Sequence, residues 1–152
     1  MAVIGNLLLQ HPERWEHAGA FCDKALRESP QNPAAHYGIG MLLALRQQSQ
    51  DALPHYRIAA SGWPENADIR INLALALADV GDVEDAFDQL EAAGRLRPIG
   101  AAAYVMIGNL MLIQSRPGDA VNAFTRALAI EPGNEEALRN LQQAQSLRNR
   151  AP

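Results

Sequence analysis

The chain has 152 residues, of which 48% are hydrophobic and 20% are charged, and its net charge is −4. This composition is too apolar for a disordered chain, so we expect one folded domain. Thirteen Lys and Arg residues stand against 17 Asp and Glu residues, which leaves no basic excess to contact phosphates and argues against nucleic acid as the main partner.

The sequence also bears on the compartment. The apolar N-terminal stretch lacks a positively charged segment, so it does not resemble a signal peptide. No apolar run approaches the about 18 residues that a membrane-spanning helix needs. We therefore expect a cytoplasmic protein without membrane insertion, or a periplasmic one if a signal peptide has been removed. Twelve of the 13 cations are Arg and Ala is abundant, a bias typical of GC-rich bacterial genomes.

A period of 34 residues runs through the chain. It is set by four prolines, Pro30, Pro64, Pro98 and Pro132. Two alanine columns share the register: Ala18, Ala52, Ala86 and Ala120, then Ala25, Ala59, Ala93 and Ala127. A third column has mostly small residues, Asn6, Gly40, Ala74 and Gly108. A fourth has side chains that can fill a core, Cys22, Tyr56, Leu90 and Phe124. The period predicts a repeated structural unit.

Residues 1–32 form a partial first unit that lacks the start of its first helix. The unit 33–66 has two apolar stripes at helical spacing, one of Ile39, Gly40 and Leu43 and one of Ala52, Tyr56 and Ala59. These stripes predict two helices that face each other, with Gly40 allowing their backbones to approach. The column proline should end each second helix, because the residue before a proline is pushed out of the helical region.

The units 67–100 and 101–134 repeat this pattern. Asp82 and Asp85 place acids at the start of one helix, and Pro117 stands where a helix can begin without losing a hydrogen bond. Residues 135–148 repeat first-helix features with a polar back, which predicts a capping helix, and residues 149–152 are expected to form a tail.

A small residue, two alanines and a proline at positions 8, 20, 27 and 32 of such a unit resemble the tetratricopeptide repeat (TPR). The resemblance covers nearly the whole chain and implies an all-α fold, a right-handed superhelical solenoid forming one domain over residues 1–148. Two features depart from the family pattern. Position 4 carries His36, Arg70 and Tyr104 instead of the usual large aromatic, and Pro54 falls inside a second helix.

The chain offers little to support catalysis. His11, His17, His36 and His55 form no i, i+4 pair and no HExxH motif, so we expect no metal site. His36 is expected to pack in its repeat column, and Cys22, the only cysteine, is expected to act as a small hydrophobic residue. There is no nucleophile elbow, phosphate loop or dinucleotide fingerprint. We expect no enzymatic activity and no cofactor.

The resemblance implies that first helices line a concave face and that positions 2, 5, 9, 12 and 13 of each unit contact a ligand. Twelve of the 15 residues at these positions in the complete units are apolar. Asn72 and Met106 stand where some relatives carry a clamp for acidic C-termini or an asparagine ladder. No such clamp is present, and a single Asn among Ile4, Gly38, Asn72 and Met106 argues against the ladder. The candidate peptide-binding residues are Tyr37, Met41, Leu45, Asp68, Ile71, Asn72, Leu75, Asp79, Val105, Met106, Asn109, Leu112 and Ile113.

An apolar concave face predicts a protein-interaction module, an adaptor or assembly scaffold that holds a hydrophobic or amphipathic peptide segment of a partner protein. Asp68 and Asp79 at one rim would favour a guest with a neighbouring Arg or Lys. Several alternatives stay open. The groove could be filled by its own side chains, or covered in a homodimer that Trp63 helps to anchor. The chain could also be the TPR region of a larger glycosyl- or sulfotransferase, or a secretion-type chaperone.

Overall fold

The computed structural model describes residues 12–150, with side chains described for residues 17–149. All regular secondary structure in this part is helical. Its helices are α2 (Pro12–Glu28), α3 (Pro33–Leu45), α4 (Ser49–Gly62), α5 (Ala67–Asp79), α6 (Val83–Leu96), α7 (Ala101–Ile113), α8 (Pro117–Ile130) and α9 (Glu135–Arg150). The expected first helix of the partial unit, with Asn6 of the small-residue column, lies outside the described residues, as does His11.

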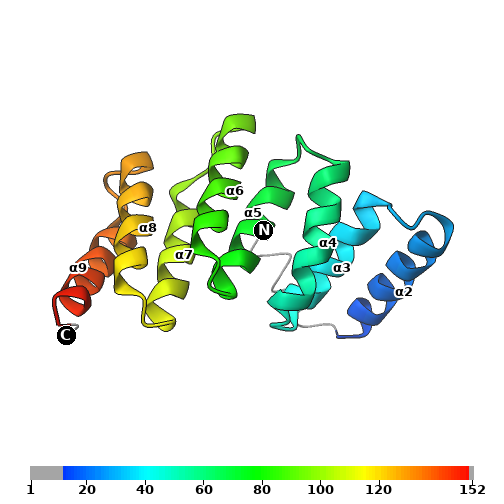
Figure 1. The fold of residues 1–152 in the computed structure, drawn as a ribbon, viewed down its shortest axis with the longest axis horizontal. Helices are drawn as coiled ribbons and strands as arrows, with labels where there is room; N and C mark the ends of the chain where they lie inside the picture. The colour runs from blue at the N-terminus through cyan, green and yellow to red at the C-terminus, as the bar shows by residue number, and fades with distance from the viewer. Residues whose placement is uncertain (1–11, 151–152) are drawn as a thin grey trace.

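The helices form a row of antiparallel pairs that runs from α2 to α9 (Figure 1). Each complete unit contributes a first and a second helix, which pack together as α3 with α4, α5 with α6, and α7 with α8. The first helices also contact one another, α3 with α5, α5 with α7, and α7 with α9. The first helices therefore make one layer, and α4, α6 and α8 make the other layer, nearer the viewer in Figure 1. The protein is an all-α helical-repeat solenoid, as predicted.

Asparagine side chains cap the start of three first helices. The side-chain oxygen of Asn32 accepts a hydrogen bond from the Ala35 amide, and that of Asn66 accepts from the amides of Asp68 and Ile69. Asn134 caps α9 in the same way. These asparagines are separated by multiples of 34 residues, and each accepts from amides that the helix itself leaves unpaired.

The second helices end as the proline column predicts. Helices α4, α6 and α8 each stop two residues before a column proline. The residue just before that proline has left the helical region, as in Arg97 with φ −157° and ψ 155°. Pro54 lies inside α4 without ending it, and Pro117 is the first residue of α8.

Small residues bring the two helices of a unit together. Both alanine columns are fully buried in the complete units, at Ala52, Ala59, Ala86, Ala93, Ala120 and Ala127. A methyl group built on Gly40 would lie 2.8 Å from the Tyr56 ring, and one on Gly108 would lie 2.5 Å from the Phe124 ring. The space that each glycine leaves is therefore filled by an aromatic ring from the opposite helix.

Helix α9 closes the C-terminal end of the described solenoid. Ala137 and Ala144 are fully buried, while most of its other side chains are exposed. The helix runs to Arg150, two residues beyond the predicted end at residue 148. Its buried alanines and exposed polar side chains show the two-sided pattern on which the prediction of a capping helix rests.

Candidate functional site

An open cavity of about 650 Å³ lies on the layer of first helices. It is bounded by α5 and α7, the end of α3 and the start of α4. Six predicted binding residues line it: Asn72, Leu75, Asp79, Met106, Asn109 and Ile113. The cavity runs across three repeat units, as a groove for an extended or helical segment requires.

The apolar lining of this groove faces solvent. Ile113 is 80% exposed and Met106 is 52% exposed, large fractions for residues of these types. Leu75 is half-buried and packs against the core. These three side chains come from neighbouring first helices, so together they form an apolar surface with no covering element in the described part of the chain.

The other predicted positions lie outside this cavity. Tyr37, Met41, Ile71 and Leu112 are half-buried against the core, and Leu45 is half-buried at the end of α3. Val105 is only 5% exposed and belongs to the core. The reason is the direct contact between adjacent first helices, which covers part of the face that each would otherwise present.

Five lining residues were not predicted as binding residues: Gln47, Ser49, Tyr56, Ala76 and Leu110. Gln47 and Ser49 belong to the turn between α3 and α4 and to the start of α4. Ala76 and Leu110 share one column of the 34-residue register. That shared column is the sequence signal that could have identified Ala76 and Leu110. Gln47 and Ser49 carry no comparable signal, because their residue types do not indicate that the turn borders a groove.

The polar side chains of the groove also join neighbouring units. The Asn72 amide donates to the Tyr37 hydroxyl at 2.7 Å. Burial raises the pKa of Tyr37, and the nearby Asp68 carboxylate adds to the rise, while this hydrogen bond opposes it. The Asn109 amide donates to Glu136 at 3.1 Å, and the Asn140 amide donates to the Asn109 side-chain oxygen at 2.8 Å. Asn72 thus links α5 to α3, and Asn109 links α7 to α9.

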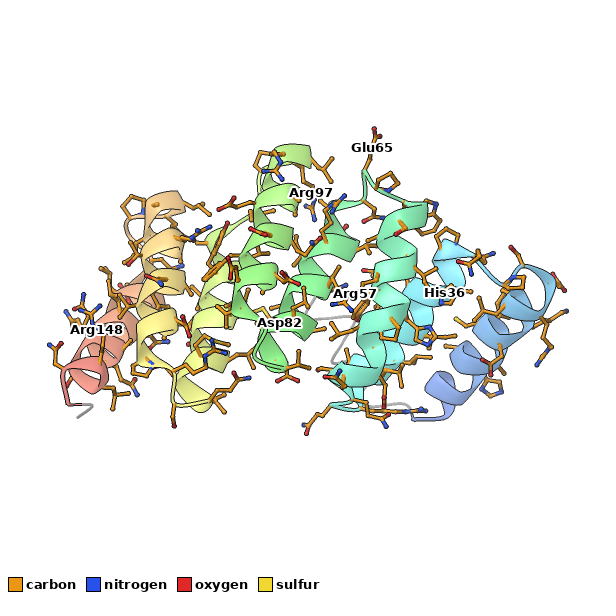
Figure 2. The ribbon with its side chains drawn as sticks, in the orientation of Figure 1. His36, Arg57, Glu65, Asp82, Arg97 and Arg148 are labelled. Carbon is orange, nitrogen blue, oxygen red and sulfur yellow. The ribbon has the colours of Figure 1, made fainter. Side chains whose placement is uncertain are left out.

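A second cavity, of about 590 Å³, lies where α4 ends and α5 begins, next to the C-terminal end of α6. Asp68 is here, and its carboxylate pairs with the Arg97 guanidinium. Figure 2 shows Arg97 and Glu65 at this same edge of the solenoid. Trp63 lines the cavity and is 42% exposed, so it is not enclosed by local packing. Asp68 and Asp79, predicted to share a rim, line different cavities.

His36 packs as its repeat column predicts, and it meets a second histidine. His36, labelled in Figure 2, is 7% exposed. Its Nδ1 lies 3.0 Å from the Nδ1 of His55 on α4. His36 Nε2 donates to the Pro30 carbonyl at 3.0 Å, and a ring with its single proton on Nε2 accepts at Nδ1 from the His55 N–H. Burial lowers the pKa of His55, and the neighbouring His36 lowers it further.

Little among the described residues supports metal binding or nucleophilic chemistry. No three His, Cys, Asp or Glu side chains gather there as a metal site would require. Cys22 is a half-buried free thiol, and burial, with a smaller contribution from Asp23, raises its pKa. A thiol with a raised pKa stays protonated and is a poor nucleophile. None of the described helices is both long and apolar enough to cross a membrane.

The fold and the groove define a class of protein: a helical-repeat solenoid whose layer of first helices presents an open cavity. The family model described as tetratricopeptide repeat matches residues 18–67, 37–98 and 71–135, and the chain belongs to this family. Such repeats are protein-interaction modules.

The relatives of this chain differ widely in size and role. Protein O-mannosyl-transferase TMTC3 of Mus musculus is 26% identical over 148 residues, covering 88% of this chain but 16% of the transferase. The crystal structure of YrrB, described as a TPR protein with an unusual peptide-binding site, has a TM-score of 0.70 and 25% identity, covering 91% of this chain and 71% of YrrB. The first TPR of Spaghetti (RPAP3), bound to the HSP90 peptide SRMEEVD, has a TM-score of 0.59 and 20% identity, covering 78% and 94% of the two chains.

Proposed function

We propose that this chain is a non-catalytic module that binds an apolar or amphipathic peptide segment of a partner protein in the groove between α3, α5 and α7. The observation that carries the proposal is the exposure of Met106 and Ile113 beside a cavity of about 650 Å³. Contiguous apolar surface of this kind is unfavourable in water unless a partner covers it. The peptide-binding site described for YrrB supports the same use of the fold.

The test begins with peptides selected from a random display library against the wild-type chain. Binding of a labelled selected peptide is then measured by fluorescence anisotropy. In the double variant Met106→Glu/Ile113→Glu, two carboxylates would be buried against the apolar peptide, so affinity should fall at least about tenfold, or ~1.4 kcal/mol. Both side chains are exposed, so the helical circular dichroism signal and the melting temperature should change little.

A matched control places the same two charges elsewhere. Leu96 and Ile130 are 40% and 46% exposed near the ends of α6 and α8, away from the groove. The variant Leu96→Glu/Ile130→Glu should keep wild-type affinity. Equal loss in both variants, or no loss in the groove variant, would contradict binding at this groove.

A second candidate role is supported by the match to an O-mannosyl-transferase, of which this chain covers 16%. In that role the chain is the TPR region of a larger glycosyltransferase, and catalysis resides in another part of the protein. Sequencing the gene in frame beyond both ends of the present sequence tests this candidate. A transferase domain in the same frame would support it, and stop codons directly flanking the repeats would refute it.

A further inference from the structure

The groove is apolar and carries negative charge at one end. Its lining residues include Asp79 but no Lys or Arg. Asp79 is exposed, and no ion pair of its carboxylate is present among the described side chains. A bound segment therefore meets an unneutralised carboxylate beside the apolar surface of Leu75, Met106 and Ile113.

Helix geometry adds to the negative character of this end. Helices α3, α5 and α7 end at Leu45, Asp79 and Ile113. These ends lie close together, since residues at or next to all three line the same cavity. The C-terminal end of a helix carries partial negative charge from carbonyls that have no partner within the helix. The Gln114 amide satisfies the carbonyls of Ala78 and Asp79, but it brings no net charge.

The cations of this region do not line the groove. Arg116 is committed to other groups, since it pairs with Asp119 at 2.8 Å and its Nη1 donates to the Gly81 carbonyl at 2.6 Å. Arg46 is exposed at the cap of α3 and does not line the cavity. An acidic ligand would thus be repelled by Asp79, while a cationic group placed there gains an ion pair and a favourable dipole.

We propose that the preferred partner segment carries an arginine or lysine directly beside a large apolar side chain. This inference rests on the proposed function of the groove and specifies its ligand. The apolar side chain covers Leu75, Met106 and Ile113, and the cation lies at Asp79 against the ends of the first helices. Apolar burial supplies most of the affinity, and the charge pair sets the orientation and rejects acidic segments.

The experiment uses the peptides selected against the wild-type chain, each compared with an analogue in which the basic residue is replaced by glutamate. Selected sequences should be enriched in Arg or Lys next to Leu, Ile, Met or Phe. The glutamate analogue should bind at least about fivefold more weakly, with the difference shrinking as salt is added, because the pair lies at an exposed rim.

Charge reversal at Asp79 supplies the decisive comparison. Asp79→Lys should weaken the basic peptide about fivefold or more and strengthen the glutamate analogue. Asp88→Lys makes the same change in net charge at an exposed position of α6 outside the groove, and it should leave both affinities unchanged. Equal effects of the two variants would overturn the inference, because only net charge would then matter.

The outcomes separate this inference from the proposed function. Selected peptides that are acidic or indifferent to charge, but sensitive to Met106→Glu/Ile113→Glu, would overturn the basic preference and leave groove binding standing. Peptides whose affinity is unchanged by Met106→Glu/Ile113→Glu, or a library that yields no binder, would count against both the basic preference and groove binding. A wild-type dimer in light scattering that is lost in the groove variant would replace the basic peptide with a second copy of the chain and also overturn the inference.

Discussion

Gly108 offers a sharp test of how the helices of one unit pack. A methyl group at this position would lie 2.5 Å from Cε1, 2.6 Å from Cζ and 2.8 Å from Cδ1 of Phe124. Phe124 is fully buried in the core, so its ring cannot turn away into solvent. The substitution Gly108→Ala must therefore push α7 and α8 apart or force the ring out of its preferred geometry.

Two opposing contributions set the size of the effect. Alanine is favoured over glycine in a helix interior by about 1 kcal/mol. Overpacking of a dense core typically costs about 1–3 kcal/mol. We expect Gly108→Ala to lower the free energy of unfolding by up to about 2 kcal/mol, because the clash involves three ring atoms and the helix preference offsets only part of its cost.

Gly94 provides the matched control within the same fold. It lies inside α6, and a methyl group there would meet Ile99 at 3.9 Å, an ordinary contact. Gly94→Ala should therefore raise the free energy of unfolding by about 0.5–1 kcal/mol. Chemical denaturation followed by circular dichroism measures both variants. If Gly108→Ala proved as stabilising as Gly94→Ala, the close approach of α7 and α8 would not be a structural requirement.

A double-mutant cycle ties the effect to one contact. In the preceding unit the equivalent pair is Ala74 and Leu90, and both are fully buried. There, an alanine in place of glycine packs against a leucine in place of phenylalanine. Phe124→Leu should accordingly relieve part of the cost of Gly108→Ala. We expect a coupling energy of about 1 kcal/mol or more, whereas additive effects would contradict the direct clash.

Two further predictions concern other parts of the solenoid. Because the pKa of His55 is lowered in the folded chain, the unfolded chain binds a proton more readily, so the free energy of unfolding should fall as the pH drops below about 6.5. Denaturation at several pH values should show this loss, and His55→Gln should weaken the dependence; an unchanged slope would refute the assignment. Asn66→Ala removes the acceptor for two backbone amides and should cost about 1 kcal/mol, while Asn66→Asp keeps the cap and most of the stability.

The repeat architecture could be predicted from sequence because one set of contacts recurs in every unit. A column such as Ala52, Ala86 and Ala120 samples the same packing environment three times, and all three are fully buried. The columns of Gly40 and Tyr56 likewise indicated which residues meet across a helix pair. A fixed period thus carries tertiary information that a single helix pattern lacks.

Contacts between different polar residues in equivalent places were harder to recognise. His36 meets His55 at a separation of 19 residues, and Arg70 donates to Gln89 at the same separation one unit later. The same two positions meet in each of these units, but the residue types at them differ. A search for recurring residue types therefore does not find this contact. Only the register itself, applied to pairs of positions instead of single ones, could have indicated that these side chains meet.

The groove residues could be predicted only in part from repeat position. The family positions separate side chains that face the partner helix from those that face away, but adjacent first helices also contact one another. Val105 is consequently buried at 5% exposure, while the next residue, Met106, is 52% exposed. Which of two neighbouring residues reaches the groove depends on how α7 is rotated against α5 and α9, and that rotation is set by packing between units. A binding face inferred from repeat position alone therefore needs the rotation of each helix before it can define the residues that a partner contacts.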